Sequence, residues 1–458
     1  MPNIHSIRHI FKDNFMTIKP NIKFVITPYK DNVVIINHDA GGGVGLRNPR
    51  GVKVFPPISY LYAISQLSEL GYHVELLDAN VLGLSHQDIV KELNSPSLSA
   101  TVIILCGSLT TVEYDIDLLQ MLRQKMPDNY YVYAGTISHF FANELLDAGV
   151  SAVLSGDIEA TITDVIPEIT SGKIVGLRRA YLSPLELDGL PSPAWDEIDI
   201  SQYTSYVILS SRGCSLACPH CPYFAYQRSR FTPRSVESVL KEIEMLYKVY
   251  QADYFLFRDP CFTCDMERVR FMVSEMNKQK IDIKWGIETR IEYLTQELLE
   301  DMAQAGLHHV RMGIEAVDEK ILHNAGRLKL TGSVEKYLSQ AKQVISWCRD
   351  ASVYSVCFFM VGFPEDTEDT IMTIQDFVDE ANPDIALVRY ITPYPGTTYA
   401  RRVKKEHLLV DEDFCLYGSR DYPVAKTKHL SLNELHHLKT YLANYLKSRN
   451  NRELAMEL

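Results

Sequence analysis

The sequence lacks any apolar run long enough to cross a lipid bilayer, which takes roughly 18 to 20 consecutive apolar residues. Its most apolar stretches, residues 100–106 and 354–363, have the length of buried strands. The first residues (MPNIHSIRHIFKDNF) also lack the apolar core and the small-residue cleavage site of a secretory signal. We therefore expect no transmembrane segment and a cytoplasmic protein.

A surplus of positive charge is missing too. The chain has 46 Lys and Arg residues against 58 Asp and Glu residues, which gives a formal net charge of −12. Because nucleic acid backbones bind clustered Lys and Arg, this balance argues against a stable nucleic acid partner. A small basic pocket stays compatible with it.

Cysteine is scarce and unevenly placed. Nine cysteines in 458 residues are an odd number and too few for a disulfide scaffold. Five of the nine fall between positions 214 and 264. This clustering indicates a metal site.

The remaining composition is that of an ordinary globular chain. Hydrophobic residues make up 46% and charged residues 23% of the sequence. These values exclude a wholly disordered, collagen-like or low-complexity chain. The length predicts two or three domains, because one hydrophobic core rarely serves so many residues.

The first half of the chain alternates short β-branched runs with amphipathic helical stretches, after a mixed polar lead-in at 1–20. The expected strands are 23–27, 33–37, 73–77, 101–106, 130–134 and 152–154, and the helices between them include 59–70, 85–93 and 114–125. Strands separated by helices of this length are typical of βαβ units. We therefore expect an α/β domain with a parallel sheet over residues 21–170.

A second alternation follows a proline-rich and acidic segment, 171–203, which we interpret as a linker. Within 204–400 the expected strands are 206–210, 254–258, 283–287, 309–313, 354–361 and 385–391, and the helices include 236–250, 295–305 and 333–350. Six βα units predict a partial (βα)6 barrel of the TIM type. The C-terminal region, 401–458, is polar and helical, and we expect it to help close the open side of the barrel.

Three cysteines occupy one short loop directly after the first expected barrel strand. The loop reads RGCSLACPHC and holds Cys214, Cys218 and Cys221 in a C-x3-C-x2-C spacing. Thiolates that converge in this way favour an iron–sulfur cluster, zinc or copper(I). A structural zinc site would need a fourth ligand, which usually comes from a second cysteine pair. The strand position places the loop at the barrel face that carries active sites.

This segment closely resembles the cluster-binding loop of the radical S-adenosylmethionine (SAM) superfamily. The resemblance implies a [4Fe–4S] cluster held by the three cysteines, with a fourth iron open to the amino and carboxylate groups of SAM. It also implies that one electron from the cluster cleaves SAM to methionine and a 5′-deoxyadenosyl radical. His220 stands where the family places an aromatic residue near the adenine.

Further family-like motifs follow the later barrel strands: FRDP at 257–260, WGIETR at 285–290, GIE at 313–315, GFP at 362–364 and PYPGT at 393–397. The resemblance implies SAM contacts from Asp259, Glu288, Arg290, Glu315 and Gly362, beside His220. A strand-end acid is also typical of a structural salt bridge, and a Gly-Phe-Pro of an ordinary turn. The order and spacing of these motifs carry the inference.

The front domain resembles the flavodoxin/Rossmann-like cobalamin-binding domain of cobalamin-dependent (class B-type) radical SAM methyltransferases. The segment from PPISYL at 56–61 to ELLD at 75–78 and the SGDIEAT element at 155–161 carry this resemblance. Ligands of open parallel sheets bind at the carboxyl ends of strands. The implied cobalamin contacts are Ser108, Leu109, Thr110, Gly135, Thr136, Gly156 and Glu159. The DxHxxG motif is absent, so no histidine ligand to cobalt is expected.

Two other motifs have plainer interpretations. The glycine-rich segment DAGGGVG at 39–45 lacks the GK[ST] ending of a phosphate-binding P-loop, so we expect a loop between domains or one that lines the corrin. Cys261 and Cys264 form a lone CxxC. It suits an auxiliary cluster or a redox pair, but without a second pair we favour ordinary or mouth-lining cysteines.

The sequence therefore predicts a cobalamin-dependent radical SAM enzyme, with C-methylation of an unactivated carbon by methylcobalamin and a 5′-deoxyadenosyl radical as the leading hypothesis. A ring closure, ring contraction or oxidative rearrangement with the same cofactors is the nearest alternative. A methylthiotransferase is disfavoured, because its front domain should carry three cluster cysteines and this one offers Cys106 alone. A non-catalytic iron–sulfur or cobalamin sensor is a further alternative. The resemblance implies a small-molecule or peptide substrate and an external electron donor of the flavodoxin or ferredoxin type.

Overall fold

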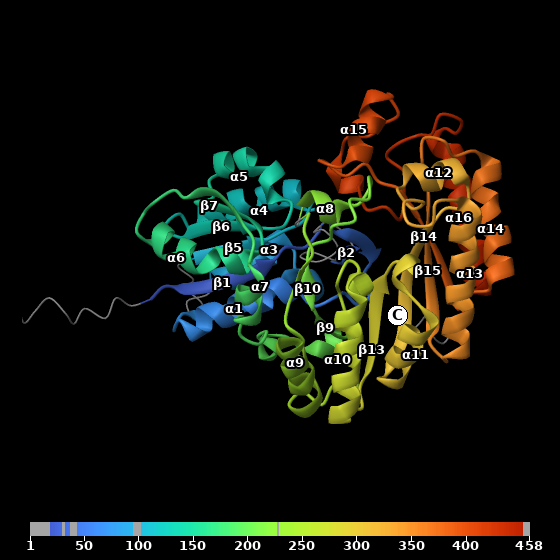
Figure 1. Cartoon of the computed structure of the whole chain (residues 1–458). Helices are drawn as coiled ribbons and strands as arrows, with labels where there is room; N and C mark the ends of the chain where they lie inside the picture. The colour runs from blue at the N-terminus through green and yellow to red at the C-terminus, as the bar shows by residue number, and fades with distance from the viewer. Residues whose placement is uncertain (1–18, 30–32, 37–43, 95–101, 227–228, 452–458) are drawn as a thin grey trace, which may run out of the picture.

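The protein consists of two parallel α/β units in sequence, joined to a C-terminal helical segment (Figure 1). The computed structural model describes residues 19–29, 33–36, 44–94, 102–226 and 229–451. Among these residues, no helix is both long and apolar enough to span a membrane.

The front unit is built on a six-stranded parallel sheet, whose strand order is β4-β1-β5-β6-β7-β8. The strands are β1 (Asn21–Ile26), β4 (His73–Asp78), β5 (Val102–Cys106), β6 (Tyr130–Ala134), β7 (Ala152–Gly156) and β8 (Gly176–Ala180). The helices are α1 (Ile58–Glu69), α2 (Ala79–Leu82), α3 (His86–Leu93), α4 (Val112–Lys125), α5 (Ala142–Ala148) and α6 (Ile162–Thr170). In sequence order of its strands the sheet reads 2-1-3-4-5-6, which extends the flavodoxin-like order and confirms the expected fold class.

Helices cover both faces of this sheet, which explains why its central strands are apolar throughout. All five residues of β5 are buried. Side chains on one face pack with α1 and α6, and those on the other face pack with α3, α4 and α5. Strands that are buried on both faces read as continuous apolar runs in this way.

Two expectations about this unit were wrong. The segment expected as a strand at 33–37 does not enter the parallel sheet. Instead β2 (Val33–Ile36) pairs with β3 (Leu46–Pro49) as a separate antiparallel ribbon, and position 37 lies outside the described residues. The segment 171–203 is also more than a linker, because β8 within it forms the sixth strand, beside β7.

The second unit is an open barrel of six parallel strands that follow one another in sequence order. The strands are β9 (Tyr206–Ile208), β12 (Tyr254–Phe257), β13 (Lys284–Thr289), β14 (Leu307–Glu315), β15 (Tyr354–Val361) and β16 (Ile385–Tyr390). The outer helices are α9 (Val236–Lys248), α10 (Met266–Gln279), α11 (Gln296–Gln304), α12 (Glu319–Asn324), α13 (Val334–Asp350) and α14 (Glu368–Ala381). The partial barrel expected from the sequence is confirmed.

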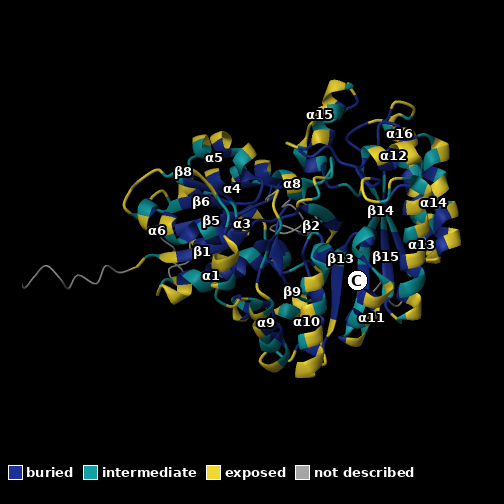
Figure 2. Ribbon diagram, in the orientation of Figure 1, coloured by how far each residue is buried: buried dark blue, intermediate teal, exposed yellow. Residues whose placement is uncertain are grey.

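Short elements connect the two units and lead into the barrel. They are α7 (Pro184–Asp188), α8 (Pro222–Tyr226) and the ribbon of β10 (Ser211–Arg212) with β11 (Thr232–Pro233). In Figure 2 the strands of both sheets are mostly dark, whereas the outer faces of the barrel helices are bright, as amphipathic covering helices require.

The C-terminal segment consists of α15 (Thr398–Lys405) and α16 (Leu432–Arg449). Helix α16 lies against β16, the last strand of the barrel sheet. Just after the helix, the Asn450 side chain accepts a hydrogen bond from the Ala386 N–H (2.8 Å) and donates one to the Ala386 carbonyl (3.2 Å). These bonds satisfy part of the free edge of the sheet.

Candidate functional site

The three-cysteine loop lies beyond the carboxyl end of β9, at the mouth of the barrel. Gly213 and Ala217 both have left-handed backbone angles, with φ of +75° and +49°, which turn the chain sharply between the cysteines. The Cys221 N–H donates to the Cys218 carbonyl at 3.1 Å, which closes the second half of the loop. All three thiols line one cavity of about 520 Å³.

The spread of these thiols suits a cluster better than a single ion. In the described part of the chain, the three sulfur atoms do not all lie within 4.8 Å of one another. A single zinc ion, at about 2.3 Å from each sulfur, holds its ligands closer than about 4.6 Å. Three soft thiols at this spread therefore fit a polynuclear iron–sulfur centre.

The surroundings of the thiols also favour a negatively charged centre. A hydrogen bond from the Cys264 thiol lowers the pKa of Cys214 to about 7, and Arg290 and Arg327 act in the same direction. Arg290 Nη1 donates to Cys218 Sγ at 3.6 Å. Burial raises the pKa of Cys221 to about 12, so this thiol needs a metal partner to lose its proton.

Four of the six residues expected to contact SAM line the same cavity as the cysteines. They are His220, Glu288, Arg290 and Glu315. Burial lowers the pKa of His220 to about 4, so its ring is neutral near pH 7. The ring lies nearly perpendicular to that of Phe363, with 6.3 Å between the ring centroids. Glu315 follows a β-bulge in β14 and has a φ of +73°, which is unusual for a residue other than glycine.

The other two expected SAM contacts are directed elsewhere. Asp259 is fully buried and accepts hydrogen bonds from the Ser210 backbone and from both the Ser210 and Ser211 side chains, so it fastens the end of β9 to the end of β12. Gly362 has a φ of +100° and donates its N–H to Asp366 at 2.7 Å. Neither residue lines the cavity, so both have a structural role here.

The residues expected to contact cobalamin lie at the carboxyl edge of the front sheet, but their side chains differ in accessibility. Ser108 and Thr110 lie beneath the backbone of Gly45, and Thr110 donates to the Gly45 carbonyl at 2.9 Å. Leu109 packs in a small apolar cluster with Val44 and Tyr394. These three side chains therefore contact the chain itself and face no open space.

Three of the expected cobalamin contacts lie closer to the interface between the two units: Gly135, Thr136 and Gly156. A Cβ added to Gly135 would lie 2.7 Å from the Gly107 carbonyl oxygen, which explains the glycine. Thr136 and Gly156 line a narrow gap of about 20 Å³ beside Gly213. The Thr136 hydroxyl is buried and has no hydrogen-bond partner among the residues that the structure describes, as expected of a group beside a polar ligand.

Glu159, the last expected cobalamin contact, instead joins the two units. It forms a buried ion pair with Arg212 at 3.0 Å, directly before the cysteine loop. Burial raises the pKa of Glu159 to about 7, against the opposing effect of the Arg212 guanidinium. Glu159 therefore anchors the loop to the front unit.

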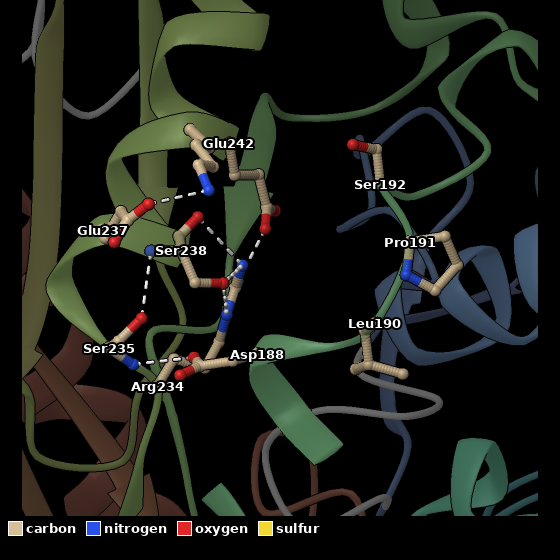
Figure 3. A pocket seen from close by; sticks show the side chains of 10 residues that line it. Asp188, Leu190, Pro191, Ser192, Arg234, Ser235, Glu237, Ser238 and Glu242 are labelled. Atoms are coloured by element: carbon tan, nitrogen blue, oxygen red, sulfur yellow. Dashed lines mark hydrogen bonds and ion pairs between the residues drawn. The ribbon is translucent and has the colours of Figure 1, made fainter. Parts of the chain in front are cut away.

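A second buried network extends this contact between the units, and Figure 3 shows part of it. Arg234 Nη1 lies 2.6 Å from Glu242 Oε2, and the Tyr62 hydroxyl of α1 donates to the same carboxylate. The pocket beside this pair, about 350 Å³ in volume, shares no lining residue with the cysteine cavity. We therefore assign this network to domain contact and not to the site.

Cys261 and Cys264 lie behind the cysteine loop. The Cys264 thiol hydrogen-bonds with both Cys214 and Cys261, but neither Cys261 nor Cys264 lines the cavity. Of the two interpretations expected from the sequence, ordinary or mouth-lining cysteines, the structure therefore agrees with the first: the pair lies outside the cavity, and Cys264 contacts one of the three loop cysteines.

Sequence reasoning missed several arginines of the cavity. Arg311 and Arg389 lie on β14 and β16, two residues from Gly313 and Leu387, which also line the cavity. Because strand side chains alternate between faces, this spacing of two could have revealed both. Arg327 comes from the loop after α12 to form an ion pair with Glu315, and no local pattern marks it.

Comparisons with known proteins agree with this site. Residues 208–378 match the model of the radical SAM superfamily. An uncharacterized methyltransferase of Pyrococcus horikoshii is 24% identical over 418 residues, covering 86% of this chain and 88% of that protein. The anaerobic magnesium-protoporphyrin IX monomethyl ester cyclase of Rubrivivax gelatinosus is 24% identical over 374 residues, covering 74% of this chain and 65% of the cyclase.

Among solved structures, the cobalamin-dependent SAM radical enzyme OxsB, with aqua-cobalamin and SAM bound, superimposes with a TM-score of 0.68. The match covers 94% of this chain and 67% of OxsB at 16% identity, so it shows a shared fold across both units. With the three-cysteine loop at the mouth of the matched barrel, these findings identify residues 208–378 as a radical SAM domain.

Proposed function

We propose that this protein is a cobalamin-dependent radical SAM enzyme that methylates an unactivated carbon. The observation that carries the proposal is the cavity of about 520 Å³, which the three cluster cysteines line together with Leu46 and Phe55 of the front unit. A site walled by both units suits chemistry that needs one cofactor from each.

In this proposal, Cys214, Cys218 and Cys221 hold the [4Fe–4S] cluster. When bound, this cluster supplies the electron that cleaves SAM reductively. Arg290 donates a hydrogen bond to the Cys218 sulfur, which stabilises the negative charge of a thiolate-bound centre.

His220, Glu288 and Glu315 are proposed to position SAM. The neutral ring of His220 offers a flat apolar face that suits a purine. Glu315 forms an ion pair with Arg327, and both residues line the cavity. Glu288 lies between Arg258 and Arg311 at the end of β13, where its carboxylate is fixed. Rigid placement of this kind favours one reactive geometry.

Cobalamin is proposed to bind between the carboxyl edge of the front sheet and the barrel mouth. The unpartnered Thr136 hydroxyl and the glycines at 135 and 156 fit a large polar ligand that approaches the backbone closely. Support also comes from the fold shared with OxsB, whose solved structure contains aqua-cobalamin. An external electron donor of the flavodoxin or ferredoxin type is part of the proposal, because the cleavage of SAM consumes an electron.

A ring closure with the same cofactors is the second candidate, because one relative is named a cyclase. The two candidates leave different products from SAM. Transfer of the methyl group leaves S-adenosylhomocysteine, whereas radical chemistry without methyl transfer leaves 5′-deoxyadenosine and methionine alone.

The experiment is an anaerobic reconstitution with iron, sulfide and hydroxocobalamin, followed by incubation with SAM and a strong reductant. Liquid chromatography with mass spectrometry then quantifies both adenosyl products. We expect retained cobalamin and both products. 5′-Deoxyadenosine without S-adenosylhomocysteine would favour the cyclase-like candidate, and a protein that retains no cobalamin would refute the proposal.

A further inference from the structure

The wall of the cysteine cavity carries more cations than anions. Its charged lining residues are Arg258, Arg290, Arg311, Arg327 and Arg389 against Glu288 and Glu315. Excess positive charge in a partly buried cavity is costly unless an anion compensates it. The pairing of these arginines shows where such an anion would bind.

Four of these five arginines form ion pairs with carboxylates. Arg327 forms an ion pair with Glu315, and Arg290 forms one with Glu292. Arg258 lies 2.5 Å from Glu288, and the Arg311 guanidinium shares the same carboxylate at 3.7 Å. Four guanidinium groups therefore share three carboxylates.

Arg389 differs from the other four. Within the described residues, no group forms a hydrogen bond or an ion pair with its side chain. Burial lowers the pKa of Arg389, the nearby Arg420 acts in the same direction, and Asp421 opposes both. Lys439 adds a further positive charge nearby.

An apolar strip leads from the interior of the barrel to Arg389. Its four residues are Val356 and Phe358 on β15 with Ile385 and Leu387 on β16, and all four line the cavity. Along β16 the residues Ile385, Leu387 and Arg389 share one face because strand side chains alternate. Arg311 lies beside Val356 in the sheet register, at the inner end of the strip.

We propose that the substrate is an organic anion with an apolar body. Its carboxylate or phosphoryl group binds Arg389, and its body lies on the strip of Val356, Phe358, Ile385 and Leu387. A planar guanidinium without a partner suits such groups because it donates two parallel hydrogen bonds to two oxygens. This inference deepens the proposed function and rests on it.

The SAM carboxylate is a poorer match for Arg389. The cysteine loop follows β9, the first strand of the barrel sheet, whereas Arg389 lies on β16, the last strand. Arg290 is the cation in direct contact with a cluster cysteine. Arg389 is therefore left for a second molecule.

The test uses simple probes on the reconstituted holoprotein with SAM present. Isothermal titration calorimetry under anaerobic conditions compares octanoate, octyl phosphate and 1-octanol, which share an apolar chain and differ in head group. We expect at least one anion to bind 10-fold or more tightly than 1-octanol. Preference for octanoate or for octyl phosphate tells which anionic group the site takes.

Substitution of Arg389 tests whether this residue is responsible for the tighter binding of the anionic probes. Arg389→Met should weaken anion binding 10-fold or more and leave 1-octanol unchanged, whereas Arg389→Lys should retain part of the preference because it keeps the charge. Arg401→Met on the exposed face of α15 is the matched control. Equal binding of all three probes, no binding of either anion, or unchanged anion binding in Arg389→Met would overturn the inference.

Iron content, measured on the same preparations, keeps the two proposals apart. Loss of the cluster from the wild-type protein speaks against the proposed function. Equal affinities for charged and neutral probes in a protein that retains its iron would overturn the anion site alone.

Discussion

Replacement of Glu242 by Ala should destabilise the protein strongly, although Glu242 lies outside the cysteine cavity. Its side chain is 4% exposed and accepts hydrogen bonds from Arg234 and from Tyr62 of the front unit. Removal of one partner of a buried ion pair costs about 3–5 kcal/mol, because the other charge stays buried. Arg234 keeps bonds to Ser238 and to the Leu209 carbonyl, so we expect about 3–4 kcal/mol.

Urea unfolding followed by circular dichroism measures this loss as a shift of the midpoint. Glu244→Ala is the matched control two residues along α9, because Glu244 pairs with Lys248 on the surface. Exposed pairs of this kind contribute about 0–1 kcal/mol. The double variant Arg234→Met with Glu242→Met should lose less than Glu242→Ala, since it leaves no unpaired charge. Equal effects of the Glu242 and Glu244 variants would refute the reasoning.

Three further predictions concern the front sheet and the second cysteine pair. Burial raises the pKa of Asp115 from 3.8 to about 7. The folded state therefore binds the proton more tightly, and stability falls as pH rises between these values. The Asp115→Asn variant has no carboxyl group to titrate and avoids this loss. Its free energy of unfolding relative to wild type should therefore rise by on the order of 4 kcal/mol from pH 4 to pH 7.5 in urea titrations. The same pH dependence of unfolding in both proteins would contradict this. The double variant Cys261→Ser with Cys264→Ser should retain about four irons per chain in a colorimetric assay, because neither residue lines the cavity. Loss of iron from this variant would instead show that these cysteines bind the cluster. Gly135→Ala should cost about 1–3 kcal/mol, since the new Cβ would meet a carbonyl at 2.7 Å, whereas Gly189→Ala, with 3.5 Å to its nearest atom, should be nearly neutral in thermal unfolding.

The pattern of apolar residues in the sequence correctly predicted the central strands of both sheets. It failed for β8, whose residues GLRRA are exposed or half-buried, because an edge strand shows little apolar alternation. It also failed for β2, since a short apolar run does not show whether its partner is parallel or antiparallel.

The sequence predicted some residues of the candidate site and misplaced others. The cysteine spacing marks its chemistry directly, and the barrel brings His220, Glu288, Arg290 and Glu315 to the same cavity. Asp259 also stands at a strand end, but tertiary packing turns it toward two serines, which strand position alone does not reveal.

The most direct test of the central claim is the iron content and SAM cleavage of the anaerobically reconstituted protein. We expect about four irons per chain and reductant-dependent formation of 5′-deoxyadenosine, and we expect both to be lost when Cys214, Cys218 and Cys221 are replaced by Ala. A protein that binds no cluster, or one whose cluster survives the triple replacement, would contradict it.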